Sequence, residues 1–246
     1  MDPQRRPTGR FTAPLPAIPP RIRSQFPRRL VNWFAAHGRD LPWRRTRDPY
    51  RILVSEILLH QTQVARVLET YARFLRQYPT LAHLARGRLR AVKAITDPLG
   101  YKIRGNWLHA IARQVMRDHG GAFPREPETL ARLCGVGPYT ANAIRCFAFG
   151  EAVPLVDANV ARVWERLFGL ERDRASAAGR RRLWFYSEAL LPADDAWRFN
   201  QGLMDFGATV CRPRVPRCEV CPMTDFCATY AAAYRTRSTA RRVAEP

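Results

Sequence analysis

The sequence predicts an all-α protein, and three observations favour this fold class. Apolar residues recur at steps of three and four through most of the chain, which is the period of a helix. Capping residues and prolines precede several of these runs. No convincing run of alternating apolar and polar residues indicates a strand. With 246 residues, of which 46% are hydrophobic, the chain can bury one large core or two small ones.

The expected helices follow one another along the chain. Asp48-Pro49 places a capping side chain before a proline in the first turn, so a helix starts there and runs through Leu58. A second helix carries apolar residues from Val64 to Leu75 at helical spacing. Further helical patterns cover residues 81–95, 104–117, 128–133, 140–149, 160–168, 180–191 and 197–209.

The two ends of the chain differ from this helical middle. Residues 1–24 carry six prolines among five arginines and offer little apolar surface, so they predict a disordered basic arm. Such an arm either adds nonspecific DNA affinity or has no function, and the sequence leaves both open. Residues 231–246 predict a basic tail. Residues 25–230 are expected to form the functional domain.

The charge balance is strongly basic. Forty-one Lys and Arg residues against 21 Asp and Glu residues give a net charge of +20 and a pI near 11.0. A surplus of this size disfavours acidic or small neutral partners and favours a polyanion such as nucleic acid. An arginine-rich proteome with solvated basic faces is the alternative that charge alone leaves open.

No segment has the composition of a membrane span or a secretory signal. The apolar stretch from Ile52 to Leu59 is short and contains Ser55 and Glu56. The N-terminus lacks an apolar core, so we expect a cytoplasmic, nucleoid-associated protein with no membrane partner. Six cysteines in such a compartment indicate metal ligands or buried thiols rather than disulfides.

Four of these cysteines are closely spaced, in the pattern Cys211-x6-Cys218-x2-Cys221-x5-Cys227. Four thiols within so short a segment can surround one metal centre. Their number suits a zinc ion and a [4Fe–4S] cluster equally, so ligand count does not choose between them. The remaining two, Cys134 and Cys146, are expected to be small buried hydrophobic residues.

A glycine pair lies between two expected helices, in Gly135-Val136-Gly137 followed by Pro138-Tyr139-Thr140. Two glycines separated by one apolar residue predict a tight hairpin whose backbone N–H groups face outward. Beside a helix N-terminus, such amides bind phosphate without reading base sequence. An ordinary glycine-rich helix turn would give the same pattern.

Two carboxylates, Asp157 and Glu56, lie beside or within apolar runs of the sequence. Asp157 and Asn159 follow the apolar run Val153–Val156 and precede a helix, so either can be its N-cap. A carboxylate in desolvated surroundings also suits chemistry through an oxocarbenium ion. Glu56 interrupts an apolar helix, where an unpaired buried charge would be costly, and it is therefore a second candidate.

These motifs together resemble the helix-hairpin-helix glycosylase superfamily, in the branch that holds the MutY adenine glycosylases and the mismatch-specific thymine glycosylases. The resemblance covers roughly residues 27–230. It is carried by Leu41-Pro42-Trp43-Arg44, Asp48-Pro49-Tyr50, Ser55 to Leu59, Gln61-Thr62-Gln63-Val64, Gly135-Val136-Gly137, Val156-Asp157-Ala158-Asn159-Val160, Asn200 to Asp205 and the four-cysteine loop.

The resemblance implies a two-lobed helical fold that binds DNA between the lobes. It implies a six-helix lobe over about 48–155, with the hairpin at 133–141. The second lobe would combine 25–47 with 156–210 and precede a [4Fe–4S] cluster loop at 211–227.

The resemblance also implies roles for the candidate residues. Asp157 would stabilise the sugar cation, Asn159 would hold Asp157 or the water, and Glu56 would assist departure of the base. Tyr139 takes the place of the lysine of bifunctional endonuclease III relatives, so no Schiff base with the sugar would form there.

Several positions depart from the MutY pattern. His60-Gln61 replaces a glutamine pair, so either residue is a candidate wedge in the DNA stack, and Tyr101 lies in a similar second loop. Ala158 resembles the thymine branch, and we expect no C-terminal domain of the kind that MutY proteins generally carry.

We therefore expect a monomeric, monofunctional DNA glycosylase that acts on mismatched or damaged duplex DNA. The expected target is thymine or uracil opposite guanine. Adenine opposite oxidised guanine or guanine is the alternative, and a non-catalytic damage-binding protein is a second one.

Overall fold

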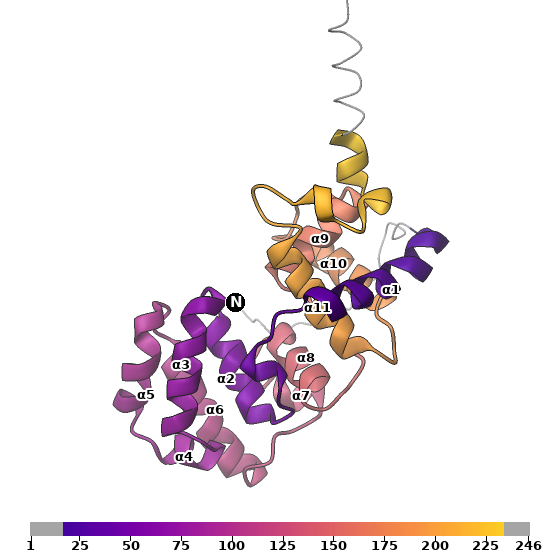
Figure 1. Cartoon of the computed structure of the whole chain (residues 1–246). Coiled ribbons are helices and arrows are strands. Elements are labelled where there is room, and N and C mark those ends of the chain that lie inside the picture. The colour runs from indigo at the N-terminus through magenta and orange to yellow at the C-terminus, as the bar shows by residue number, and fades with distance from the viewer. Residues whose placement is uncertain (1–16, 234–246) are drawn as a thin grey trace, which may run out of the picture. The chain divides into compact units, whose positions relative to one another are not determined.

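The computed structural model describes residues 17–233, and within them every regular element is a helix, which confirms the predicted all-α class (Figure 1). The α-helices are α1 (Pro20–His37), α2 (Pro49–Leu59), α3 (Val64–Gln77), α4 (Leu81–Arg86), α5 (Leu89–Thr96), α6 (Arg104–His119), α7 (Pro127–Leu130), α8 (Pro138–Phe147), α9 (Ala158–Phe168), α10 (Ala177–Ala189) and α11 (Ala196–Thr209). Short 3-10 turns lie at Pro42–Arg44, Asp97–Leu99, Cys218–Val220 and Thr224–Phe226. In this described part of the chain, no helix has the length and apolar character that crossing a bilayer requires.

The chain divides into two compact units. Among the described residues, unit 2 comprises Asp40–Val153, and unit 1 is discontinuous, comprising residues 17–39 and 154–233. Residues 40–47, which we had expected in the same lobe as the chain's two ends, therefore belong to unit 2. The reason is packing: Leu41 and Trp43 are buried in the core of unit 2, and the Trp43 ring lies 5.3 Å from that of Tyr71, edge to face.

Unit 2 is built around α2 and α6. α2 packs against α3, α6 and α8, and α6 packs against α4 and α5. α2 begins as predicted, because the Asp48 carboxylate accepts a hydrogen bond of 2.9 Å from the Tyr50 N–H and Pro49 occupies the first turn. The single helical pattern predicted over 81–95 is instead two helices, because Gly87 ends α4 in an extended conformation.

Unit 1 is held together by α11, which packs against both α1 and α9. The predicted disordered arm is wrong for its last residues, since α1 begins at Pro20. Ile18 and Ile22 are buried in the same core as Phe26, and this apolar burial offsets the entropy of ordering the segment. Residues 1–16 of the predicted arm and 234–246 of the predicted tail lie outside the described residues.

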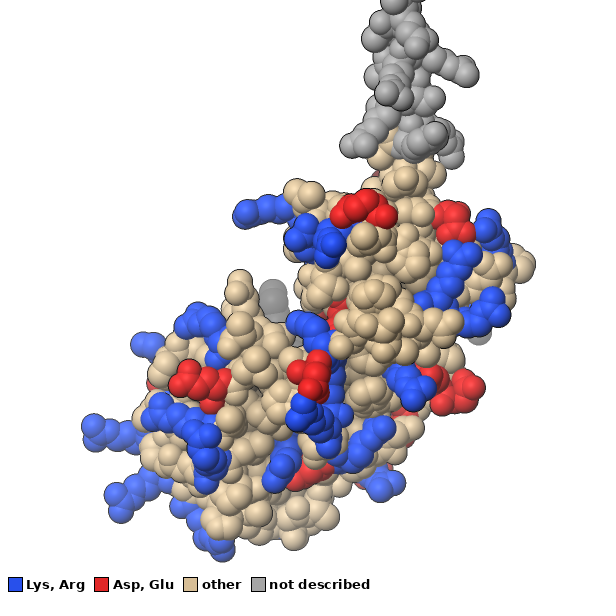
Figure 2. All heavy atoms as spheres, viewed as in Figure 1, with Lys and Arg blue, Asp and Glu red and all other residues tan. Residues whose placement is uncertain are grey.

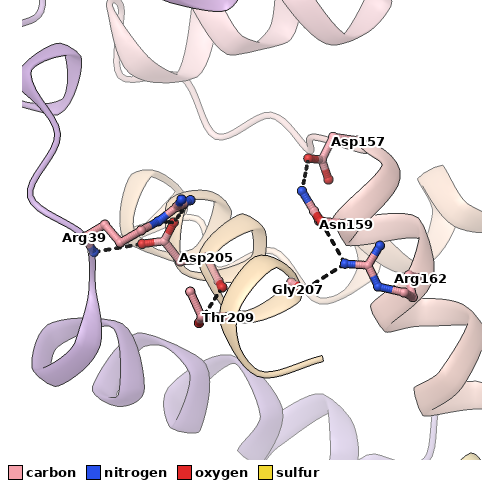
Figure 3. Close-up of polar contacts among 7 residues, drawn as sticks. All are labelled: Arg39, Asp157, Asn159, Arg162, Asp205, Gly207 and Thr209. Carbon is pink, nitrogen blue, oxygen red and sulfur yellow. Dashed lines mark hydrogen bonds and ion pairs between the residues drawn. The ribbon is translucent and has the colours of Figure 1, made fainter. Parts of the chain in front are cut away.

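One ion pair joins the end of α1 to α11 (Figure 3). Asp205 is fully buried and accepts hydrogen bonds from the backbone N–H, Nε and Nη2 of Arg39, at 2.9, 2.8 and 2.5 Å. A buried carboxylate is tolerated only when its charge is compensated in this way. The pair therefore fixes the N-terminal helix of unit 1 to a segment that lies 166 positions later in the sequence.

Replacing Asp205 by Asn should lower the free energy of unfolding by about 3 kcal/mol, because the substitution breaks a buried charge pair. Urea unfolding measures the change. Asp225→Asn is the matched control, since Asp225 also pairs with arginines of α1, at 2.7 Å and 2.8 Å, but is 36% exposed. The control should lose no more than about 1 kcal/mol. Equal losses in the two variants would contradict the assignment.

Candidate functional site

Asp157 lies at the N-terminus of α9 in unit 1 and caps that helix. Its Oδ1 accepts a hydrogen bond of 2.7 Å from the Val160 N–H, and its Oδ2 accepts one of 2.9 Å from the Asn159 side-chain amide (Figure 3). Burial raises the pKa of Asp157, while these hydrogen bonds and the nearby Arg162 charge oppose the rise. The carboxylate is therefore both a helix cap and a desolvated acid held in one orientation.

Arg162 continues this network one turn along α9. Its Nη2 donates to the Asn159 Oδ1 at 2.8 Å and to the Gly207 carbonyl at 2.7 Å, and its Nε donates to the Cys211 carbonyl at 2.8 Å. Arg162 was not among the residues predicted from the sequence. A signal was present, because Arg162 follows Asn159 by three positions and so shares its helix face.

A second arginine lies beside the same helix. Arg174 pairs with the buried Glu165, with Nε and Nη2 each 2.6 Å from a carboxylate oxygen, and its Nη1 donates to the Ala158 carbonyl at 3.4 Å. The Glu165 carboxylate, and to a smaller extent Asp157, raises the pKa of Arg174. The start of α9 therefore carries positive charge that stabilises an ionised Asp157.

The other two catalytic candidates belong to unit 2. Glu56 lies in the middle of α2 and is 5% exposed, among the buried apolar residues of that helix. Tyr139 is the second residue of α8 and is half-buried. α2 and α8 pack against each other within unit 2. The structure thus divides the four predicted catalytic residues evenly between the two units.

The predicted wedge residues lie in two loops of unit 2, a first loop (60–63) between α2 and α3 and a second loop (100–103) before α6. His60 is half-buried, its ring packs edge to face against Trp107 at 5.8 Å, and burial lowers its pKa. Gln61 is exposed and has a φ of 52°, a left-handed conformation that costs a non-glycine residue energy. Tyr101 is exposed, and its ring also packs against Trp107, at 5.7 Å.

The glycine hairpin has the predicted tight geometry. Gly135 has a φ of 74°, and a Cβ added there would lie 2.5 Å from the Trp107 ring. The buried Val136 closes the turn by donating its N–H to the Leu133 carbonyl at 3.0 Å. Gly137 is the N-cap residue of α8, and no side chain caps that N-terminus in the described structure.

Thr140 and Cys134 lie on either side of the glycine pair. Thr140 is buried in the first turn of α8. Cys134 is exposed, so its predicted burial is wrong, because it lies in the turn rather than in a helix. Cys146 lies in α8 and is buried as predicted.

The four C-terminal cysteines follow α11 in unit 1 and are all half-buried. Arg166 Nη1 lies 3.4 Å from the Cys211 Sγ, and the Met223 N–H lies 3.4 Å from the Cys221 Sγ. Burial raises the pKa of Cys221 to about 12 and also raises the pKa values of Cys218 and Cys227. Within residues 17–233, no three His, Cys or acidic side chains form a group that could hold a metal ion. The metal centre therefore stays a prediction.

The surface of each unit is basic. In the face drawn in Figure 2, Lys and Arg side chains are spread over both units and acidic side chains are fewer. Several arginines of unit 2 outside the ion pairs are exposed, including Arg73, Arg86 and Arg90. This distribution provides a nonspecific attraction for a phosphate backbone.

The helical hairpin and the carboxylate at the start of α9 define a class of DNA repair protein. Residues 54–186 match the family described as "HhH-GPD superfamily base excision DNA repair protein". The chain belongs to this family, as the sequence resemblance predicted.

Two groups of relatives bear on which member of the family it resembles. The human adenine DNA glycosylase is 42% identical over 80% of this chain, which covers 38% of that protein's length. The thymine/uracil-DNA glycosylase of Pyrobaculum aerophilum is 36% identical over 80% of this chain and 87% of that protein. The chain thus spans less than half of the human relative.

Solved structures show the same fold. A thermostable thymine-DNA glycosylase superposes with a TM-score of 0.80 at 36% identity, over 86% of this chain and 98% of that one. A trapped endonuclease III–DNA covalent intermediate superposes with a TM-score of 0.73 at 23% identity, over 86% of this chain and 98% of that one. The second match supports the fold alone.

The hairpin geometry makes a stability prediction. Gly135→Ala should lower the free energy of unfolding by more than about 1 kcal/mol, because an alanine is strained at this φ and its Cβ would clash with Trp107. Gly137→Ala is the matched control, since its Cβ would meet nothing within 4 Å and its φ of −91° is ordinary. The control should cost less than the Gly135 variant, at most about 1 kcal/mol in thermal and urea unfolding, because alanine is a poorer N-cap than glycine. A control as unstable as the Gly135 variant would contradict this account of the turn.

Proposed function

We propose that the protein is a monofunctional DNA glycosylase that hydrolyses the N-glycosidic bond of a mispaired base in duplex DNA. The observation that carries the proposal is Asp157, a desolvated carboxylate fixed at the start of α9 by Val160 and Asn159. A fixed anion of this kind offsets the positive charge that develops on the sugar as the bond to the base breaks. Mismatched duplex DNA is the proposed partner.

The proposed reaction begins with extrusion of the target nucleotide. Basic side chains and the hairpin amides hold the phosphate backbone, while the first and second loops enter the base stack. Gln61 suits the tip of the wedge because it is exposed, whereas His60 is half-buried behind it. Extrusion costs a few kcal/mol and is cheapest at a mismatch, which supplies part of the selectivity.

The chemical step then uses the candidate acids in different roles. Glu56, buried in α2, would assist departure of the base by supplying a proton. Asp157 would stay ionised and stabilise the sugar cation until water adds to it, which leaves an abasic site. Asn159 and Arg162 hold Asp157 in position and are positioning residues in this reaction.

Thymine or uracil opposite guanine is the first proposed target. The solved thymine-DNA glycosylase is 36% identical and covers 86% of this chain, and the alanine at position 158 resembles the thymine branch. Adenine opposite oxidised guanine or guanine is the second candidate. It is favoured by the 42% identity with human adenine DNA glycosylase and by the segment Gln61-Thr62-Gln63-Val64.

The absence of strand-cutting activity is a separate part of the proposal. Tyr139 lies at the start of α8, in the position where bifunctional relatives carry lysine. A phenol cannot form the Schiff base that leads to strand cleavage, so the enzyme should stop at the abasic site.

We further propose that Cys211, Cys218, Cys221 and Cys227 hold a [4Fe–4S] cluster. Four thiolates suit zinc and a [4Fe–4S] cluster alike, and the resemblance to the MutY and thymine glycosylase branch favours the cluster. A four-iron cluster distributes its ligands over separate iron atoms, and N–H donors such as that of Met223 stabilise its sulfur ligands. A brown protein with four irons per chain would distinguish this group from zinc.

The substrate proposal predicts the products of one gel assay. Duplexes carrying G:T, G:U or A opposite 8-oxoguanine are incubated with the enzyme and then resolved with and without alkali. We expect product from G:T and G:U only after alkali treatment. Product from the adenine duplex alone would establish the second candidate. Cleavage before alkali would contradict the role of Tyr139, and binding without product from any duplex would favour a damage-binding protein.

Asp157→Asn should retain binding to mismatched DNA but lower the single-turnover excision rate by at least about 1000-fold, since it removes the stabilising charge. The wild-type rate should rise with pH, because the ionised carboxylate is the active form and burial raises its pKa above the usual 3.8. The acid limb of the profile should therefore lie above pH 3.8.

Asp48→Asn is the matched control, because Asp48 also caps a helix and asparagine caps equally well. It should excise at the wild-type rate. Near-wild-type excision by the Asp157 variant would end the catalytic assignment.

A further inference from the structure

Arg104, the first residue of α6, is a fully buried arginine that no carboxylate neutralises among the described residues. Burying a guanidinium is costly unless its N–H groups have acceptors. The acceptors of Arg104 therefore show which segments it holds in place. All of the Arg104 hydrogen bonds go to oxygens of the α2 C-terminus and of the first and second loops.

The guanidinium reaches three segments at once. Its Nε donates to the Ile57 carbonyl at 3.1 Å, and its Nη1 donates to the Tyr101 carbonyl at 3.3 Å. Its Nη2 donates to both the His60 carbonyl and the Thr62 Oγ1. The Ile57 and His60 carbonyls lie at the C-terminus of α2, where helix carbonyls lack partners and favour a cation. Arg104 therefore closes the end of α2 and joins the first loop to the second.

Trp107, one turn further along α6, makes the complementary apolar contacts. Its ring packs edge to face against His60 of the first loop and against Tyr101 of the second loop. It also lies against Gly135, where even a Cβ would clash. One side chain thus touches all three segments to which we assign DNA contacts.

We propose that Arg104 and Trp107 are positioning residues that hold the first loop, the second loop and the hairpin as a single rigid DNA-inserting unit. The inference rests on the proposed function, because it assigns these segments to base extrusion. Neither side chain touches the reacting atoms in this scheme. Their contribution is to order the loops before DNA binds, so that ordering them does not consume binding energy.

The geometry also explains the residue types. Lysine carries its three donors on one nitrogen, whereas the guanidinium spreads five donors over three nitrogens and so reaches acceptors in three separate segments. Arg104 donates to the carbonyl of His60, the residue before the left-handed Gln61, and this hydrogen bond stabilises the strained loop conformation.

The test compares two duplexes that present the same target base, once mispaired and once opposite an abasic-site analogue, where no pairing must be broken. Arg104→Lys should lower the single-turnover excision rate on the mispaired duplex by about tenfold or more, and on the unpaired duplex by less than about twofold. Trp107→Phe should give the same pattern with a smaller loss. Equal losses on the two duplexes, or no loss on the mispaired one, would overturn the proposal.

A matched variant controls for destabilisation. Val115→Ala removes a fully buried side chain from the same helix, outside the three segments, and should slow both duplexes equally if it slows either. Fluorescence of 2-aminopurine beside the mismatch reports extrusion without chemistry. If the wild-type protein excises nothing, the proposed function fails, but the fluorescence rise still tests whether Arg104 contributes to base extrusion. An unchanged rise with Arg104→Lys would overturn the inference.

Discussion

The discontinuous unit 1 depends on α11 more than on any other element. On one side, its buried Asp205 receives three hydrogen bonds from Arg39 and so holds α1. On the other side, Gly207 lies so close to Asn159 that an added Cβ would be 2.8 Å from the Asn159 Cβ. Because α1 and α9 both pack against this helix, the position of α9, and with it Asp157, is set by contacts that are distant in sequence.

The electrostatics of Asp157 follow from that placement. Its oxygens satisfy an N–H group at the start of α9, and the positive end of a helix stabilises an anion. Burial acts in the opposite direction and raises the pKa. An exposed cap would interact more weakly with a sugar cation, and an uncapped buried acid would be protonated. The capping hydrogen bonds favour the ionised carboxylate while burial limits its solvation, and under these two conditions an ionised Asp157 would stabilise positive charge.

The structural features that could be predicted from the sequence are those fixed by residues close together in the chain. The Asp48-Pro49 start of α2 and the tight turn at Gly135 are fixed by residues a few positions apart, and the structure contains both. The start of α1 was missed because Ile18 and Ile22 gain their burial from later helices. Arg104 and Arg162 were missed because most of their acceptors are backbone carbonyls up to 49 positions away, and the spacing of Arg162 from Asn159 was the one local signal.

Arg104 and Arg162 both satisfy backbone carbonyls that a helix C-terminus leaves without partners. Each is buried, and each donates to carbonyls at or just beyond a helix C-terminus: Arg104 at the end of α2, and Arg162 at Gly207 and Cys211 around the end of α11. Carbonyls there are unsatisfied by the helix and carry partial negative charge, so a guanidinium compensates them without a carboxylate. Because most of the acceptors belong to the backbone, these hydrogen bonds fix the path of the chain itself.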